Sequence, residues 1–184
     1  MNRLIVTLVS TLIIACTVHL ATILILPYVA PQDVWTRLDR LGAPGTFHIL
    51  PAATPGQAAD RNSDPAIVMA ICRYDLEKAP FRISGDPSLW YWGLALHTNR
   101  GFIYYSINNR AIGDGTLDLR ILNEDDYAAK QQEEVEEAAQ EFVVASPSTR
   151  GYVVLRALVP EQSARMQIEE NFKKVKCEPY KEAN

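Results

Sequence analysis

The first feature of the hydrophobic pattern is an unbroken apolar run near the start of the chain. Residues 4–26, LIVTLVSTLIIACTVHLATILIL, contain no Asp, Glu, Lys or Arg. As an α-helix the run would be roughly 34 Å long, enough to cross a hydrocarbon core of about 30 Å. A cleavable signal peptide has a shorter apolar region of roughly 7–15 residues before a small-x-small site, and Tyr28 stands where a small residue belongs. We therefore expect residues 1–27 to form an uncleaved transmembrane anchor.

Two side chains inside this run raise alternatives to a plain anchor. Ile13, Ile14, Ala15 and Cys16 resemble the lipobox of bacterial lipoproteins, in which the cysteine is acylated. The residues after Cys16 continue the apolar run instead of forming a polar tether, which favours the anchor. His19 is costly in a bilayer and suggests a haem ligand or a proton relay. Because the run holds no second histidine, packing against a neighbouring helix is the expected role.

The charges that flank the run set the expected topology. Arg3 and the α-amino group precede it, whereas Arg37 and Arg40 follow it together with Asp33 and Asp39. Positive charge biases a flank toward the cytoplasm, and a short N-terminal tail with one arginine is typical of a signal anchor. We expect the N-terminus in the cytoplasm and the rest of the chain outside it.

A short stretch of helical periodicity follows the anchor. Val34, Leu38 and Leu41 recur at helical spacing within residues 28–44, which predicts a juxtamembrane amphipathic helix. Trp35 suits the membrane interface, but the helix can equally pack on the domain that follows. Both alternatives stay open from the sequence.

From residue 66 onward the pattern is that of β-strands. Residues 45–65 show little periodicity and are expected to be a connecting loop with one short strand at 46–50. Seven further stretches are β-branched, aromatic or alternating, namely AIVMAICRYDL, PFRISG, LWYWGLALH, GFIYYSIN, TLDLRIL, EFVVAS and GYVVLRALV. Their turn-separated spacing over residues 66–184 predicts an antiparallel β-sandwich or a barrel-like domain.

Two helices are expected in this domain besides the strands. The first covers residues 123–140, with Asn123 as its cap. The second follows Pro160 and ends near Lys176; its apolar face should dock on a sheet and comprises Ala164, Ile168, Phe172 and Val175. The fold class predicted for the whole chain is therefore α+β and mainly β, with an N-terminal transmembrane helix.

The most aromatic part of the domain, residues 90–108, is predicted to be a β-hairpin around the turn TNRG. One face of the incoming strand should hold Trp90, Trp92, Leu94 and Leu96. One face of the outgoing strand should hold Ile103, Tyr105 and Ile107. Most of the aromatic side chains are thereby assigned to the core or to cross-strand packing.

Charge and cysteine content narrow the function class. The net charge of −4 gives no reason to expect nucleic acid, since domains that bind it normally carry a basic stripe. Cys72 and Cys177 lie in the body and can oxidise outside the cytoplasm. We predict a Cys72–Cys177 disulfide that ties the C-terminal tail to the strand containing Cys72. The cysteine and histidine spacing indicates no metal site, and no cofactor is expected.

Five polar residues are candidates for ligand binding: Arg73, Asp75, His97, Asn108 and Arg110. Arg73 and Asp75 share one strand face, where they either bind a polar ligand or form a local ion pair. His97 lies on the face opposite the tryptophans, and Asn108 to Arg110 end a strand with side chains suited to turns. The chain has no GxSxG, P-loop or HExxH motif. No catalytic residue is assigned.

A resemblance to a known family covers nearly the whole chain. It is carried by DPAIVMAICRYDLEKAPFRISG, by the Trp/Tyr strand and YYSINNRA after it, and by the anchor ending HLATILILP. The matching residues are Asp64, Cys72, Arg73, Tyr74, Asp75, Leu76, Pro80, Trp90, Tyr105, Ser106, Asn108 and Arg110. By these residues the chain resembles the short, single-anchor members of the domain of unknown function 1254 family of uncharacterised bacterial membrane proteins.

This resemblance implies a β-sandwich anchored in the bacterial inner membrane with its domain in the periplasm. It implies no established activity, cofactor or catalytic residue. Longer relatives join this domain to a second β-domain of unknown function, and short members are often encoded beside a separate protein of that second type. Such a companion, anchored in the same membrane, is the partner that the resemblance suggests.

Together these features predict a membrane-anchored envelope domain that binds or assembles with another envelope protein and performs no catalysis. A small amphiphilic ligand held by the sandwich is the other binding hypothesis. The alternative is a membrane-tethered hydrolase or carbohydrate-active enzyme that uses His97 with Arg110 or Asp75. The question of enzyme activity stays open, with the non-catalytic interpretation favoured.

Overall fold

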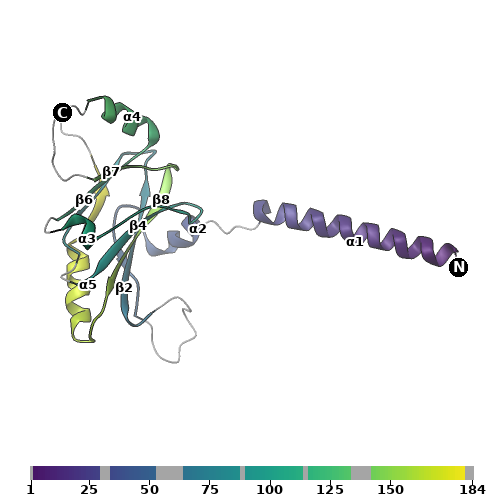
Figure 1. The fold of residues 1–184 in the computed structure, drawn as a ribbon, viewed down its shortest axis with the longest axis horizontal. Coiled ribbons are helices and arrows are strands. Elements are labelled where there is room, and N and C mark those ends of the chain that lie inside the picture. The colour runs from purple at the N-terminus through teal and green to yellow at the C-terminus, as the bar shows by residue number, and fades with distance from the viewer. Residues whose placement is uncertain are drawn as a thin grey trace. The chain divides into compact units, whose positions relative to one another are not determined.

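The computed structural model describes residues 2–29, 34–52, 64–87, 90–113, 116–133 and 142–180 (Figure 1). By contacts the chain divides into two units, Met1–Gln32 and Asp33–Asn184. The short helix expected beside the membrane and the start of the expected connecting loop therefore belong to the second unit.

The first unit consists of one helix, α1 (Asn2–Val29). Its segment Asn2–Leu26 is long and apolar enough to cross a membrane, which confirms the N-terminal apolar helix and suits either an anchor or a signal sequence. The threonine hydroxyls of α1 donate to carbonyl oxygens one turn earlier, from Thr7, Thr11, Thr17 and Thr22. These bonds satisfy the hydroxyls within the helix, as a segment in lipid requires.

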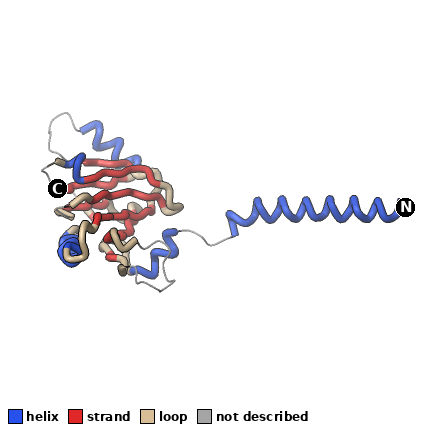
Figure 2. The backbone as a smooth tube through the Cα atoms, turned by 60° about the horizontal axis from the view of Figure 1, so that its bottom comes forward, coloured by secondary structure: helices blue, strands red, loops and turns tan. Residues whose placement is uncertain are grey.

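The second unit contains a five-stranded antiparallel sheet in the order β1-β2-β8-β4-β5. Its strands are β1 (His48–Ile49), β2 (Ile67–Asp75), β8 (Arg150–Leu158), β4 (Trp92–Thr98) and β5 (Ile103–Asn108). The short strand expected within the connecting loop is β1. Figure 2 shows the strands at the centre of this unit and the helices at its periphery.

A second sheet has four strands in the order β7-β6-β3-β9. They are β7 (Phe142–Ala145), β6 (Leu117–Leu122), β3 (Phe81–Gly85) and β9 (Lys176–Pro179). β7 runs parallel to β6, because α4 (Glu124–Glu133) lies on the connection between them and turns it into a crossover. The rest of the predicted helix, residues 134–140, lies outside the described residues.

The core lies between the two sheets and is closed by α5 (Ala164–Lys174). Alternate residues of β2, β4 and β8 and of β3 and β6 enter it, among them Val68, Leu94, Leu96, Leu155, Ile83, Leu119 and Ile121. Ala164, Ile168, Phe172 and Val175 are all buried there. The α+β, mainly β fold class and the docking face of α5 are confirmed.

A disulfide joins the two sheets. Cys72 of β2 is bonded to Cys177 of β9 across 105 residues of sequence, which confirms the predicted pair. A loop of this length corresponds to about 4–5 kcal/mol of stabilisation in the chain-entropy model. Together with the N-terminal apolar helix, the disulfide indicates an extracytoplasmic domain.

Two short elements were not predicted. β9 occupies residues at the end of the predicted second helix and beyond it: the helix stops at Lys174, and Val175 is buried with extended backbone. Residues 176–179 then pair with β3. The other element is α3 (Asn109–Ile112), one turn that follows β5 directly.

Candidate functional site

The candidate site is the outer face of the five-stranded sheet. Alternate residues of β2, β8, β4 and β5 point away from the core there because successive strand residues face opposite sides. Two adjoining pockets lie on this face, both lined by Ile67, Val154 and Arg156. We name them the strand pocket, of about 380 Å³, and the helix pocket, of about 540 Å³.

The strand pocket has a floor of small side chains. Gly93, Ala95 and Ser106 line it from β4 and β5, because the sequence alternates them with large buried residues such as Leu94 and Ile107. Neighbouring positions that lack bulk leave a depression in the sheet surface.

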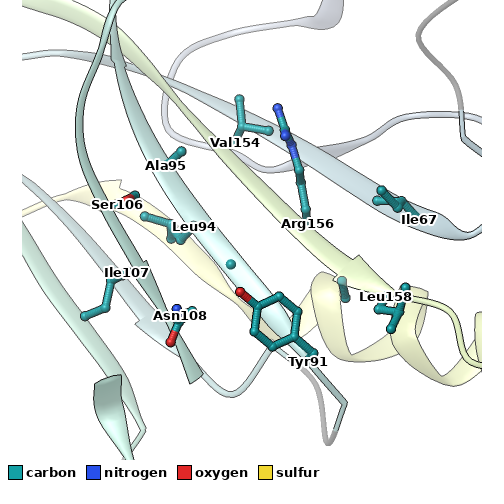
Figure 3. Close-up of a pocket in the computed structure, with 12 residues that line it drawn as sticks. Ile67, Tyr91, Leu94, Ala95, Ser106, Ile107, Asn108, Val154, Arg156 and Leu158 are labelled. Atoms are coloured by element: carbon teal, nitrogen blue, oxygen red, sulfur yellow. The ribbon is translucent and has the colours of Figure 1, made fainter. Parts of the chain in front are cut away.

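The rim of the strand pocket is formed by large side chains. Tyr91 is 49% exposed and Leu158 is 48% exposed, while Arg156 is exposed beside them. Figure 3 shows the Tyr91 ring with its hydroxyl turned over the strands and the Arg156 side chain extended from β8 beside Val154. Arg156 forms no ion pair with any residue that the structure describes. The pocket thus offers apolar surface together with one unpaired positive charge.

The helix pocket is lined by Val34 and Leu38 of α2 (Val34–Leu38), by residues 50–52 and Asp64, and by residues of the sheet. The 3₁₀ turn η1 (Asp39–Leu41) continues the α2 segment. Val34, Leu38 and Leu41 pack against a small cluster of outward-facing residues, Ile71, Tyr152 and Val154. Of the two alternatives for this amphipathic segment, packing on the domain is the arrangement observed.

Arg73 fixes that segment to the sheet. Its side chain is buried, and its Nη1 donates to Asp39 Oδ1 at 2.8 Å while Nη2 donates to the carbonyl of Gly42. The guanidinium also lies 4.8 Å from the centroid of the Trp35 ring, a cation–π distance. Arg73 lines neither pocket. Its contacts give it a structural role, because they hold the α2–η1 segment against the sheet.

Asp75 does not pair with Arg73 although both belong to β2. Its Oδ2 lies 3.6 Å from Arg150 Nε, and its Oδ1 accepts from the backbone N–H of Glu77 at 3.2 Å. Arg150 in turn contacts the carboxylate of Glu77 at 3.0 Å. Asp75 therefore belongs to a small charge network at the end of the sheet.

His97 borders the helix pocket. It is 7% exposed, and its ring stacks on Tyr152 at a centroid distance of 4.6 Å. The Nδ1–H donates to the carbonyl of Gly101 at 3.3 Å, which leaves Nε2 as an acceptor without a partner among the described residues. Burial lowers the pKa of His97, and the charge of Arg156 lowers it further against the opposing effect of the Gly101 bond.

Asn108 and Arg110 belong to the turn after β5. Asn108 Oδ1 accepts from the backbone N–H groups of Arg110 at 3.0 Å and Ala111 at 3.2 Å, so it caps α3 as its turn-forming character suggested. Asn108 also lines the strand pocket. The Arg110 side chain is exposed and lines neither pocket.

A hydroxyl network behind this face was not predicted. Leu96 pairs with Tyr105 and His97 pairs with Ile103, so Tyr104 is an extra residue in β5. The bulge brings the Tyr104 hydroxyl 2.8 Å from that of Tyr74, and Tyr74 also lies 3.1 Å from Ser146 Oγ. Burial raises the pKa of both tyrosines.

The same bulge makes one part of the predicted hairpin wrong. Strict alternation predicts Ile103 on the face of Tyr105 and Ile107, but Ile103 is 61% exposed. The extra residue reverses the alternation at this point, and Tyr104 packs against the core instead.

Of the five sequence candidates, the structure places His97 and Asn108 on the adjoining pockets and Arg73, Asp75 and Arg110 elsewhere. Sequence reasoning missed Tyr91 and Arg156. The alternation of side chains along β8 could have indicated that Arg156 faces outward, because its neighbours Leu155 and Ala157 are buried. Within the described ranges, no group of three or more His, Cys, Asp or Glu side chains is arranged to hold a metal ion.

The chain is similar in fold to part of one solved bacterial protein and matches a second one more weakly. The VPA0106 protein from Vibrio parahaemolyticus matches with a TM-score of 0.55 at 10% identity over 80% of this chain and 34% of that chain. An uncharacterised protein from Burkholderia cenocepacia matches with a TM-score of 0.48 at 12% identity over 83% of this chain and 42% of that chain. No protein-family model and no curated protein sequence matches the chain.

The likeness to the Vibrio protein shows the fold alone, since function resides in sites and not in folds. The chain spans less than half the length of either solved protein. The fold that occupies part of the Vibrio chain is here preceded by an apolar helix.

Proposed function

We propose that this protein is a membrane-anchored, non-catalytic binding domain that captures another envelope protein through the outer face of its five-stranded sheet. The α1 helix remains uncleaved as a signal anchor, with the N-terminus in the cytoplasm and the β-domain in the bacterial periplasm. The Cys72–Cys177 bond supports this side of the membrane, because structural disulfides persist in oxidising compartments.

The proposal rests on Arg156, which is exposed, forms no ion pair with the described residues and lines both of the largely apolar pockets. Arginine and tyrosine are enriched among the residues that dominate binding energy at protein interfaces, and Tyr91 stands on the same rim. A partner segment with apolar side chains and one carboxylate would fill the pockets and neutralise the charge.

The neighbouring strand edge supports a protein as the occupant. β5 is the last strand in the sheet order, so one of its edges has no strand beside it among the described residues. Ser106 and Asn108 of β5 also line the strand pocket. An extended segment can add to such an edge through backbone hydrogen bonds while alternate side chains enter the pocket.

The resemblance to the domain of unknown function 1254 family suggests the identity of the bound partner. We propose the companion membrane-anchored β-domain that is often encoded beside short members of that family. Both proteins would be held in one membrane, where tethering raises their effective concentration.

The hydrolase alternative receives no support from the geometry. His97 is on β4 and Asp75 on β2, with β8 between those strands, and the carboxylate of Asp75 contacts Arg150. Arg110 lies on α3 beyond the other side of β4. A general base and its helper must be within hydrogen-bond reach, and the structure, which describes all three residues, shows no hydrogen bond or ion pair between them.

A site-specific photocrosslinker tests the proposal in native membranes. Placed at Tyr91, it should give one discrete crosslinked protein with its own membrane anchor, identified by mass spectrometry. Placed at Met166, which is exposed on α5 outside both pockets, it should give none. Crosslinks from Tyr91 to lipid or to a small amphiphile alone, or no crosslink at all, would overturn the partner-protein proposal.

A further inference from the structure

The turn between β4 and β5 presents the most exposed pair of adjacent apolar side chains in the described part of the β-domain. Phe102 is 70% exposed and Ile103 is 61% exposed. Arg100, on the same turn, is exposed as well. We name residues 99–103 the hairpin tip.

The exposure is built into the backbone of the hairpin. The N–H of Thr98 donates to the carbonyl of Phe102 at 2.9 Å, and the N–H of Gly101 donates to the carbonyl of Thr98 at 3.0 Å. Gly101 has a φ of +94°, which a residue with a side chain rarely adopts. The bulge at Tyr104 then turns Ile103 outward. A hydrogen-bonded turn thus holds both apolar side chains away from the core of the domain.

The hairpin tip lies beside Val34, the first residue of α2. A Cβ atom placed on Gly101 would be 3.5 Å from Cγ2 of Val34. Val34 follows the end of α1 at Val29 by five residues. Five chain steps span at most about 18 Å in any conformation, so an uncleaved α1 keeps this part of the domain near the bilayer.

We propose that the hairpin tip is a second membrane contact, with Phe102 and Ile103 inserted into the lipid interface and Arg100 against anionic headgroup phosphates. This inference rests on the proposed function in one respect, the retention of α1 as an anchor. Two apolar side chains next to a basic one are the composition that interfacial segments use. The contact would orient the binding face with respect to the membrane and would limit rotation about the anchor.

The test uses the full chain in vesicles of phosphatidylcholine and phosphatidylglycerol. Phe102→Cys in a Cys16→Ser background carries an environment-sensitive fluorophore, while Cys72 and Cys177 stay oxidised and do not react. Quenching by spin-labelled lipid reports burial in the bilayer, and quenching by iodide reports exposure to water.

Met166→Cys in the same background is the matched control, because Met166 is 75% exposed. It is adjacent to Arg165, whose side chain donates to the carbonyl of Ile67, and Ile67 pairs with Leu158 at the end of β8. The hairpin tip instead adjoins Gly151 at the start of β8. Seven residues of strand, about 24 Å, separate the two ends.

We expect lipid quenching to be about threefold or more stronger at residue 102 than at residue 166, as follows from insertion by roughly 5–10 Å, with iodide quenching in the reverse order. Arg100→Gln should reduce the lipid quenching in vesicles rich in phosphatidylglycerol but leave it unchanged in pure phosphatidylcholine. Equal quenching at residues 102 and 166 would overturn the inference, as would a tip that is crosslinked to a protein and shielded from both quenchers.

A third probe separates this failure from failure of the anchor. Native Cys16 is free and exposed on α1, so the same fluorophore on it reports whether α1 is in the bilayer. If lipid quenches the Cys16 probe but the probe at residue 102 is exposed to water, α1 is an anchor and the hairpin tip does not contact the membrane. An iodide-quenched Cys16 probe rejects both.

Discussion

At the scale of single residues, Gly151 shows how closely the backbone of β8 packs against buried side chains. Gly151 lies where the backbone of β8 passes over the buried Tyr74: a Cβ atom there would be 2.1 Å from the Tyr74 hydroxyl and 2.3 Å from the carbonyl oxygen of His97. That space is what lets Tyr74 reach Tyr104 and Ser146. The absent side chain at one position thus makes room for a three-hydroxyl network.

Gly151→Ala should therefore lower the free energy of unfolding by about 1–3 kcal/mol, as overpacking of a core typically does. Urea denaturation of the purified full chain would measure it. Gly93→Ala is the control, since the nearest atom to an added Cβ there is 3.9 Å away, and it should leave stability equal or slightly higher. Equal effects of the two substitutions would contradict the packing account.

His97 predicts a pH dependence of stability. Burial lowers its pKa in the folded state below the unfolded value of 6.5, so below about pH 6.5 the unfolded chain binds more protons than the folded one. The stabilisation is complete above that pH and is lost as the pH falls through 6.5 toward the folded pKa.

Thermal or urea unfolding between pH 5 and pH 7.5 would show this loss in the native protein. In His97→Gln the loss should be clearly smaller, because the titrating group is gone. Parallel pH profiles for the two proteins would assign the loss to other groups.

At the scale of secondary-structure elements, the alternation of apolar and polar residues predicts most strands and their buried faces. Features that depend on how strands pair cannot be predicted from that alternation. The buried stripes of β2, β4, β6 and β8 and of α5 were all visible as patterns. The bulge in β5 was not, because a period of two cannot show where one extra residue enters a strand. β9 has four residues and one buried position, so only its pairing with β3 makes it a strand.

The candidate site was predictable to the same degree. His97 and Asn108 were selected because they are polar residues in an aromatic hairpin, and both line the pockets. Arg73 and Asp75 are candidates because they share one face of β2. Both are used in structural contacts, because their neighbours in space come from distant segments, Asp39 and Arg150. Sequence spacing within one strand carries no information about such partners.

The disulfide gives a prediction at this scale. Cys72→Ser with Cys177→Ser should lower the free energy of unfolding by about 2–5 kcal/mol, because the bond closes 105 residues and ties the two sheets together. Denaturation with and without a reductant would measure the same loss in the native chain. Cys16→Ser should have no effect on the β-domain, and a reductant-insensitive native protein would contradict the account.

At the scale of the whole molecule, we propose a membrane-tethered β-sandwich that binds a partner on the outer face of its five-stranded sheet. The inner faces of both sheets are used for the core, and α2 covers part of the outer face through Val34 and Leu38. The remaining part holds the two pockets and Arg156. Its place next to the edge strand β5 makes it the surface on which binding is expected.

Binding of the purified, crosslinked partner to Arg156→Glu tests whether the outer sheet face is the binding surface. Measured with the full chain in nanodiscs, the substitution should raise the Kd by about tenfold or more, as loss of a buried charge pair does. Lys174→Glu, the same charge reversal at an exposed position outside both pockets, should leave the Kd within about twofold. Equal Kd values for wild type and Arg156→Glu would contradict the account.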